Sequence, residues 1–539
     1  MLCVTLRDRM LRVAISPPLA QRARRATAFL PWSPALIGAA YLIVFVARLP
    51  TLIEHLYWDS DAATATVIAE TFGRTGTVIL ERFGWFTGLW FELLTRPLPL
   101  HRQLWEIAPY LFSLASVALL AFASWRLAGR WAAAMTATAA VTTSPFVSYD
   151  LITLNFHTAT WVATVVLGVF CLRLTREPPV ARFVPAMVVV TVFAGVTLAS
   201  DLLFAFTGLI PFALTGVLLA TFRRFRSVGV IVVASACVAP LIAWATFWAM
   251  RAANVQVFPV PTRFAEDKDL WPNVGRLLRG IVQLVNGDYF FNARLTVSTM
   301  LSFACAVLIL IALASPFVLF RRNRRSATPC VPLLVYSCFW ASCVTFVCVS
   351  FVLSSEGTHG GYYLISILYA TAATVPLVAV GSRLARLIAS VGIGVVATTS
   401  LVNLTDTGKS LPRPLPPVAS VAGRIVEIAR KEGASRGYAD YWDASSLTWS
   451  THMAVQVAPV TQCVLPKTDL CRFWFNLNTN WYRPRPNTNT FVLRDSQSDV
   501  RQELPKSLRA YASYKLNDFI TMYLFSYDVA ERFVGGPSP

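Results

Sequence analysis

The chain has 539 residues, of which 55% are hydrophobic and only 14% are charged. Soluble domains carry about 25% charged residues, so this composition excludes an ordinary soluble enzyme. The formal net charge of +19 is concentrated in arginine clusters between apolar runs, at Arg22–Arg25, Arg223–Arg226 and Arg321–Arg325. Such clusters are typical of orientation signals in membrane proteins and do not indicate a nucleic-acid partner.

Apolar runs of roughly 17 to 25 residues are long enough to cross a hydrocarbon core of about 30 Å. They predict about eleven transmembrane helices, at 29–49, 105–125, 131–147, 158–174, 183–200, 203–221, 228–249, 296–319, 330–353, 363–380 and 387–403. The first run lacks a small-residue cleavage site, and we therefore expect it to remain as a span.

The arginine clusters favour a cytoplasmic N-terminus. We predict a basic N-terminus at 1–28, a transmembrane domain at 29–403 with large outside loops at 50–104 and 250–295, a Pro-rich linker at 404–417, and an extracytoplasmic C-terminal domain at 418–539. The predicted location is the cell membrane, either plasma or inner, with many spans.

The C-terminal region is long enough for a small core of its own. Its pattern predicts a strand at Ser435–Asp440, a short helix at Trp442–Thr451 and a strand at Met453–Val460, which together indicate a small α/β domain. Cys463 and Cys471 lie eight residues apart in this region. A disulfide there and two free thiols both remain open, because the outcome depends on export.

Two carboxylates, Asp59 and Asp61, follow the first span, where a lipid head group would meet water. A carboxylate at that level is suited to act as a general base toward a sugar hydroxyl, or to bind a divalent cation with its neighbour. The alternative is that Asp61 caps a helix and Asp59 is solvated. We expect an amphipathic helix at Asp61–Phe72, ending before Gly73 and lying along the membrane interface beside the aromatic stretch at 83–91.

The stretch Trp58-Asp59-Ser60-Asp61-Ala62, continuing to Ile68-Ala69-Glu70, resembles the acidic-motif helix of the protein mannosyltransferase and aminoarabinose transferase branch of the GT-C glycosyltransferases. As architecture, the resemblance covers roughly the first 400 residues. It implies a GT-C-like α-helical polytopic fold, a sugar donor carried on a polyprenyl phosphate, and an acidic residue that activates the acceptor. By this resemblance Asp59 or Asp61 is the catalytic candidate, and Asp61 is preferred.

A second resemblance lies at Thr358–Leu364, before the tenth span. Related enzymes have a basic residue followed by Tyr-Tyr-Leu-Leu-Pro there, which is implied to meet the lipid phosphate. Here His359 is the basic candidate, followed by Tyr362 and Tyr363. The pattern departs from the family because Gly360 and Gly361 precede the tyrosines and Ile365-Ser366 replaces Leu-Pro, so a Gly-rich turn with interfacial aromatics is an equal alternative.

Four further residues are candidates. His157, which begins the fourth span, is placed to face the same cavity as Asp61, whereas Asp201 is expected mainly to cap a helix. Arg102 and Arg263 are candidate phosphate ligands, because arginine makes bidentate contacts with phosphate. The alternative for both arginines is a solvated surface.

Aromatic residues crowd the C-terminal region among Asn and Asp. They are Tyr438, Tyr441, Trp442, Trp449, Trp474 and Trp481. Aromatic rings with polar edges suit carbohydrate binding, but at these spacings they more often form a hydrophobic core.

These features predict an inverting membrane glycosyltransferase, either a hexosyl- or a pentosyltransferase. It would move a sugar from a polyprenyl-phosphate donor to an extracytoplasmic glycan, lipid or protein acceptor. The expected partners are this donor, the acceptor and membrane lipid. No cofactor is required, and a divalent cation remains an option. The rival is a lipid-linked glycan flippase or transporter whose exported tail binds substrate.

Overall fold

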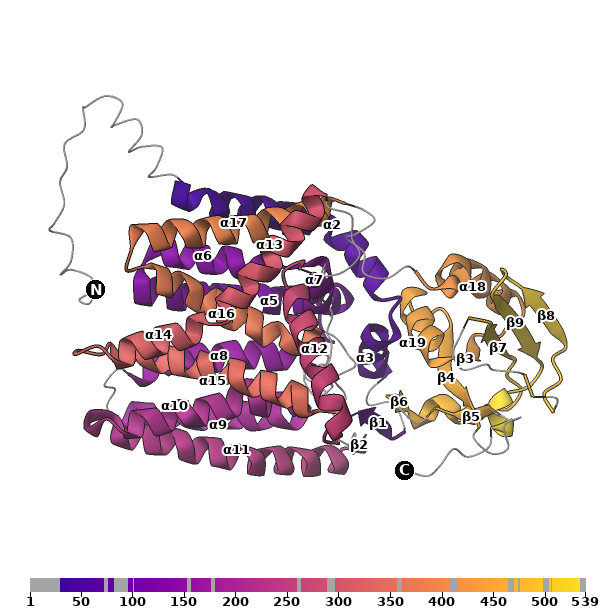
Figure 1. Cartoon of the computed structure of the whole chain (residues 1–539). Helices are drawn as coiled ribbons and strands as arrows, with labels where there is room; N and C mark the ends of the chain where they lie inside the picture. The colour runs from indigo at the N-terminus through magenta and orange to yellow at the C-terminus, as the bar shows by residue number, and fades with distance from the viewer. Residues whose placement is uncertain are drawn as a thin grey trace.

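The structure is a computed structural model of the whole chain (Figure 1). It describes residues 30–71, 76–81, 96–99, 101–152, 157–175, 180–258, 263–287, 296–355, 361–406, 415–463, 470–473, 476–497, 504–505 and 507–533. Within these ranges the chain forms a helical bundle and a smaller α/β domain at 415–533.

All eleven predicted apolar runs are helical in the described part of the chain. The helices of the bundle are α2 (Ser33–Leu56), α5 (His101–Ala128), α6 (Arg130–Val141), α8 (Thr158–Leu174), α9 (Val180–Ser200), α10 (Ile210–Ala220), α11 (Arg226–Ala252), α13 (Val297–Ala312), α14 (Ser315–Arg324), α15 (Val331–Leu353), α16 (Ile365–Ala379) and α17 (Arg383–Thr405). Among the described residues, seven helical segments are long and apolar enough to cross a membrane, and three shorter apolar helices accompany them. The predicted polytopic fold class is confirmed.

The helices of the bundle lie roughly side by side and run between its two ends, from left to right in Figure 1. The connector Arg223–Arg226 and the end of α14 at Arg321–Arg325 lie away from the α/β domain; we call this the arginine end. The opposite, domain end carries α3 (Ser60–Thr71), α7 (Pro145–Ile152) and α12 (Asp267–Gln283). The two arginine clusters that the structure describes therefore lie at one end of the bundle, as the sequence predicted, and Arg22–Arg25 lies outside the described residues.

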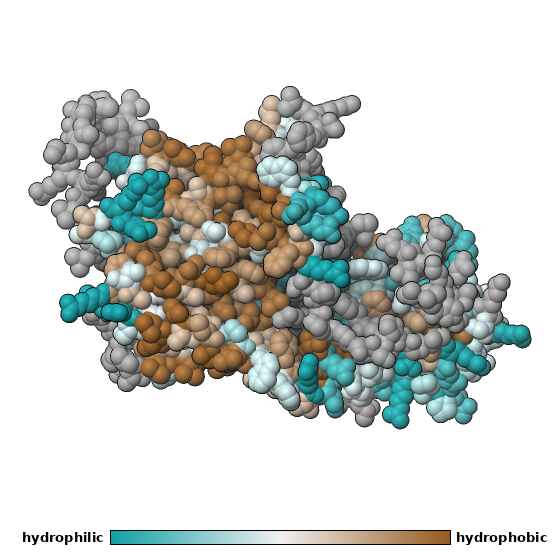
Figure 2. Space-filling view, turned by 60° about the horizontal axis from the view of Figure 1, so that its bottom comes forward, coloured by the Kyte–Doolittle hydropathy of each residue, from teal (hydrophilic) through white to brown (hydrophobic). Residues whose placement is uncertain are grey.

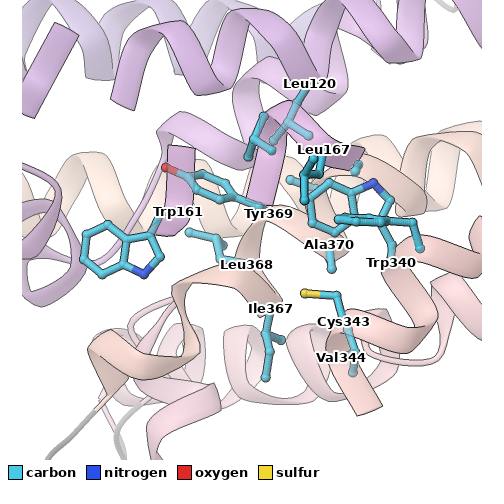
Figure 3. Close-up of a cluster of buried hydrophobic side chains, with 14 of the residues drawn as sticks. Leu120, Trp161, Leu167, Trp340, Cys343, Val344, Ile367, Leu368, Tyr369 and Ala370 are labelled. Carbon is cyan, nitrogen blue, oxygen red and sulfur yellow. The ribbon is translucent and has the colours of Figure 1, made fainter. Parts of the chain in front are cut away.

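The part of the bundle core that is drawn in Figure 3 includes residues of α5, α8, α15 and α16. Trp340 and Tyr369 are fully buried there, next to Leu167 and Leu368. A Cβ atom added at Gly168 would come within 2.9 Å of the Trp340 ring, so glycine is what allows α8 and α15 to approach. Large side chains thus pack against small ones, which gives this core its density.

The face of the bundle seen in Figure 2 is mostly hydrophobic, whereas the α/β domain and the two ends of the bundle carry polar residues there. Large side chains on α11 and α9 are exposed, including Trp244 at 63% and Val189 at 68%. Such a continuous apolar surface is stable in lipid but not in water.

The α/β domain contains η5 (Pro417–Val421), α18 (Ala422–Lys431), α19 (Tyr441–Ser450) and a six-stranded sheet. The strands are β3 (Arg436–Ala439), β4 (Gln456–Gln462), β5 (Leu470–Arg472), β7 (Thr490–Asp495), β8 (Ala512–Lys515) and β9 (Ile520–Phe525), in the order β5-β4-β3-β7-β9-β8. The three central strands, β4, β3 and β7, are parallel, and the outer pairs are antiparallel. The predicted strand, helix and strand correspond to β3, α19 and β4.

A second sheet joins the two parts of the molecule. Its strands are β2 (Val255–Phe258), β1 (Val78–Glu81) and β6 (Leu477–Asn478), in the order β2-β1-β6. They come from the segment between α11 and α12, the segment between α3 and α5, and the α/β domain. A shared hydrophobic core at this junction includes Leu56, Trp105, Trp449 and Leu477.

The prediction for the helix after the first span was wrong in two respects. Helix α3 is not an amphipathic interfacial helix, because residues 62–69 are all buried between the bundle and the α/β domain. Its cap is Asp59 rather than Asp61: the Asp59 side chain accepts a hydrogen bond from the Asp61 backbone N–H at 3.0 Å. The aromatic stretch at 83–91 and Gly73 lie outside the described residues.

Cys463 and Cys471 form a disulfide that links the end of β4 to β5. The question that the sequence left open is thereby answered in favour of pairing. Buried apolar side chains on both faces of the sheet, among them Tyr438, Leu447 and Phe491, give this domain its own core.

Candidate functional site at the domain end

Asp61 lies in the first turn of α3, at the junction of the bundle and the α/β domain. The turn forms because Asp59, just after α2, accepts from the Asp61 N–H and from the Ala63 N–H through its backbone carbonyl. Both aspartates are partly buried. A helix N-terminus favours negative charge, so the position suits a carboxylate.

Tyr441, the first residue of α19, reaches Asp61 from the α/β domain. Its hydroxyl donates a hydrogen bond to Asp61 Oδ1 at 2.8 Å. Burial, followed by the charge of Asp61, holds the pKa of Tyr441 well above its usual value. The hydroxyl therefore stays protonated at neutral pH and remains a donor to the carboxylate.

Further contacts fix α19 against this loop. The Ser60 hydroxyl donates to the carbonyl of Trp442 at 2.6 Å, and the Ser450 hydroxyl donates to the carbonyl of Tyr57 at 3.3 Å. The rings of Tyr57 and Trp449 lie 5.5 Å apart. Contacts at both ends of α19 thus hold Tyr441 in register with Asp61.

Carboxyl groups of the α/β domain lie near the same helix. Asp440 follows β3, Asp443 lies in the first turn of α19, and Asp495 ends β7. These strands are parallel neighbours, so their carboxyl ends meet at one edge of the sheet. Burial, together with the charges of Asp495 and Asp440, raises the pKa of Asp443 to about 8.

A second cluster of polar side chains, His157, Thr160 and Asp201, lies at the same end of the bundle. His157 precedes α8, and its Nδ1 lies 2.6 Å from Asp201 Oδ2, with both side chains buried. Thr160 donates to the same carboxylate oxygen, and the Leu203 N–H donates to Oδ1 at 2.9 Å. Asp201 therefore has the predicted capping contact and also binds a histidine, which the sequence did not indicate.

The connection after Asp201 is irregular. The turn Ala205–Leu209 is π-helical, and within it Thr207 accepts a hydrogen bond from Thr164 on α8 at 2.8 Å. A π-helical turn inserts an extra residue into a helix, and such turns are frequent at functional sites.

Tyr363 lies beside this pair. Its ring centroid is 5.0 Å from that of His157, and it belongs to η4 (Gly361–Leu364), which contacts α12 and α7 at the domain end. The structure therefore brings two predicted residues, His157 and Tyr363, into contact. The side chain of Tyr362 and the whole of His359 lie outside the described residues.

Of the two predicted arginine ligands, Arg263 has a described side chain. Arg263 is exposed, and its backbone carbonyl accepts from the Ser355 N–H. Arg276, from the same loop, donates to Asn273 at 2.9 Å, and Asn273 in turn binds the end of α15. Arg102 is the second residue of α5, and its side chain lies outside the described residues.

Most of the predicted aromatic residues of the α/β domain are core residues. Tyr438, Trp449 and Trp481 are buried. Trp442 is 50% exposed, and Trp474 lies outside the described residues. Tyr441 has the most direct link to the candidate site, and no local signal in the sequence pairs it with a residue 380 positions earlier.

Among the described residues, no group of three His, Cys, Asp or Glu side chains is arranged to hold a metal ion. Asp59 uses one carboxylate oxygen to cap α3, and Asp61 binds Tyr441. Each of the two carboxylates, Asp59 and Asp61, therefore accepts a hydrogen bond from another protein group.

We compared the chain with known protein families, curated proteins and solved structures. No family model matches the sequence, and no curated protein matches it. The chain is similar to the crystal structure of ArnT from Cupriavidus metallidurans in the apo state, with 12% sequence identity and a TM-score of 0.40. The match covers 93% of this chain and 99% of that chain.

Proposed function

We propose that this protein is a membrane glycosyltransferase of the GT-C type that acts at the domain end of its bundle. It takes a sugar from a polyprenyl-phosphate donor and transfers it, with inversion, to an extracytoplasmic acceptor. The acidic motif at Trp58–Ala62 carries the family resemblance, and the observation that carries the mechanism is the position of Asp61. Its carboxylate lies at the N-terminus of α3, next to the lipid-facing bundle, and is held by Tyr441.

Asp61 is the general base in this proposal. It accepts the proton of the acceptor hydroxyl as that oxygen attacks the anomeric carbon, and the lipid phosphate departs. Both the helix N-terminus and the hydrogen bond from Tyr441 stabilise a negatively charged carboxylate. Asp59 has the supporting role of capping α3, which fixes the position of Asp61 in the first turn of the helix.

The departing phosphate needs cationic or hydrogen-bonding groups nearby. His157 and Tyr363, which are in contact at the domain end, are the proposed binding residues. Arg102, Arg263, His359 and Tyr362 remain candidates from the sequence. Asp201 orients the His157 ring through its contact with Nδ1.

The orientation is also part of the proposal. The arginine end faces the cytoplasm and the α/β domain lies outside. The disulfide between Cys463 and Cys471 supports this orientation, because disulfides persist in oxidising compartments.

The test is transfer of labelled sugar from a panel of synthetic polyprenyl-phosphate sugars, with purified protein and membrane extract as acceptor. Asp61→Asn is expected to abolish transfer, since general-base catalysis contributes about 10²–10⁴-fold. Asp59→Asn should weaken the cap by about 1 kcal/mol and lower transfer less. Asp518→Asn, at a side chain 87% exposed, is the matched control and should equal wild type.

If both Asp61→Asn and Asp59→Asn transfer sugar like wild type, the mechanism is wrong. If wild type uses no donor in the panel, lipid-flipping assays would decide whether the protein is a flippase instead.

A further inference from the structure

An apolar groove lies on the bundle between α13, α14, α16 and α17, with a volume of about 420 Å³. Its floor is buried, as shown by Leu368 and Ile393. Its rim is exposed on the outer surface, with Ile311 at 67% and Ile388 at 62%. Because the exposed rim residues are apolar, we expect the groove to open toward the hydrocarbon of the membrane.

Small side chains create the space. The lining includes Ala312, Ala314, Ala372, Ala379, Ala385, Ala389 and Gly392. A Cβ atom added at Gly392 would lie 3.1 Å from Leu308, so α13 and α17 are already in contact there. The groove therefore exists because the side chains that line it are small, and not because the helices are far apart. Void surface of this kind is costly unless apolar atoms fill it.

The length of the groove along α17 matches the thickness of the hydrocarbon of one leaflet. On α17 the lining extends from Ala385 to Val396, which at 1.5 Å per residue is about 16 Å. Half of a hydrocarbon core of about 30 Å is about 15 Å. Because Ala385 lies two residues into α17, the groove begins at the arginine end and reaches the middle of the membrane.

Positive charge lies where the groove begins. Ser315, Val318 and Arg322 follow i, i+3, i+7 spacing on one face of α14, and the first two line the groove. Arg322 Nη1 donates to the carbonyl of Val378, another lining residue, at 3.3 Å. The exposed Arg321, Arg324, Arg325 and Arg383 are close in the chain, and neither 313–330 nor 380–386 contains Asp or Glu.

We propose that this groove binds an anionic membrane phospholipid, with one acyl chain along α17 and its phosphate at Arg322. Hydrocarbon fills a dry apolar groove without any loss of hydrogen bonds to water. A guanidinium at the membrane surface binds phosphate, and an excess of arginine favours an anionic over a zwitterionic head group. This lipid site lies at the opposite end of the bundle from Asp61 and is independent of the proposed catalytic reaction.

The test is native mass spectrometry of the purified full-length protein after delipidation and addition of phosphatidylglycerol or phosphatidylcholine. Wild type is expected to retain one phosphatidylglycerol in preference to phosphatidylcholine. Arg322→Gln should lower the affinity for phosphatidylglycerol about tenfold, which corresponds to about 1.4 kcal/mol of binding free energy. Ala389→Leu, which fills the groove, should reduce retention of both lipids.

Arg325→Gln is the matched control, because it removes an equal charge from the same connector without a groove contact. It should retain phosphatidylglycerol like wild type. Equal binding of the two lipids by wild type, or unchanged retention in both Arg322→Gln and Ala389→Leu, would overturn the proposal. Thermal melting of each variant in detergent shows that it is folded, and Arg322 is exposed, so its substitution spares the core.

Discussion

The Tyr441 hydroxyl donates a hydrogen bond to the Asp61 carboxylate across the junction between the bundle and the α/β domain, at 2.8 Å. The two residues are 380 positions apart in the chain. The candidate base is therefore positioned by a residue of another domain, and loss of that contact should alter chemistry more than folding.

Tyr441→Phe removes only the hydroxyl. We expect kcat for sugar transfer to fall about 10- to 100-fold, since removal of one hydrogen bond to a charged group costs about 1.5–3 kcal/mol. KM for the donor should change little, because Tyr441 contacts the carboxylate and not the proposed lipid-phosphate residues. Steady-state kinetics with a reactive polyprenyl-phosphate sugar measure both constants.

Tyr511→Phe is the matched control, because its hydroxyl also bonds a carboxylate, Glu432, but on the far side of the domain. It should behave like wild type. A Tyr441→Phe enzyme with unchanged kcat would show that the α/β domain does not act on Asp61.

Asp443→Asn tests the effect of pH on stability. The folded-state pKa is raised from 3.8 to about 8 by burial and by Asp495 and Asp440. The folded state therefore binds the proton more tightly than the unfolded state, so stability is greatest below about pH 4 and declines as pH rises toward 8. Asp443→Asn should remove this decline.

Melting curves of the purified protein at pH 5, 7 and 8.5 provide the measurement. The variant should gain most over wild type at pH 8.5 and least at pH 5. A variant that melts below wild type at pH 8.5 would contradict the assigned burial of an uncharged carboxyl group.

His157→Gln and Asp201→Asn test the buried pair. Loss of one partner leaves a buried charge or polar group, and such losses cost about 3–5 kcal/mol. The double variant should be less destabilised than the sum of the two, with a coupling energy of about 1–3 kcal/mol. Thermal unfolding in detergent of the four proteins gives this cycle, and additive effects would show that the pair is not coupled.

Asp528→Ala should destabilise the α/β domain by about 3–5 kcal/mol. Asp528 is fully buried, binds Arg436 at 3.0 Å, and accepts from the Tyr438 hydroxyl at 2.6 Å. Arg436 also donates to carbonyls of the turn η6 (Thr479–Tyr482), which follows β6, and to the carbonyl of Arg483 just after that turn. Hydrogen exchange should therefore increase at β6 and at its partner β1.

The exposed pair Lys515–Asp518 supplies the control in the same domain. Asp518→Ala should cost less than about 1 kcal/mol, because exposed ion pairs contribute little. Equal losses from Asp528→Ala and Asp518→Ala would contradict the role of the buried network.

Chemical labelling of Cys463 and Cys471 tests the proposed orientation of the protein in the membrane. If the α/β domain is outside, maleimide should label these cysteines in intact cells only after reduction. Replacement of both by serine should cost about 2–3 kcal/mol, as expected for closure of a short loop. Labelling without reduction would mean that the two thiols are free, which would contradict the disulfide.

The sequence by itself determined the parts of the fold that depend on local composition. Runs of apolar residues produce helices because lipid offers no other partner for backbone N–H and C=O groups. The strand, helix and strand around Tyr441 also follow from short patterns. The acidic motif at Asp59–Asp61 was visible for the same reason, since it is a local sequence feature.

Tertiary structure alone decided where these elements lie relative to one another. The helix at Ser60–Thr71 carries polar residues but is buried, because the α/β domain packs on the side that the sequence assigned to the membrane surface. His157 meets Asp201, and Asp61 meets Tyr441, only through packing between distant segments. Contacts at such separations depend on the shape of the whole fold, which periodicity and composition do not encode.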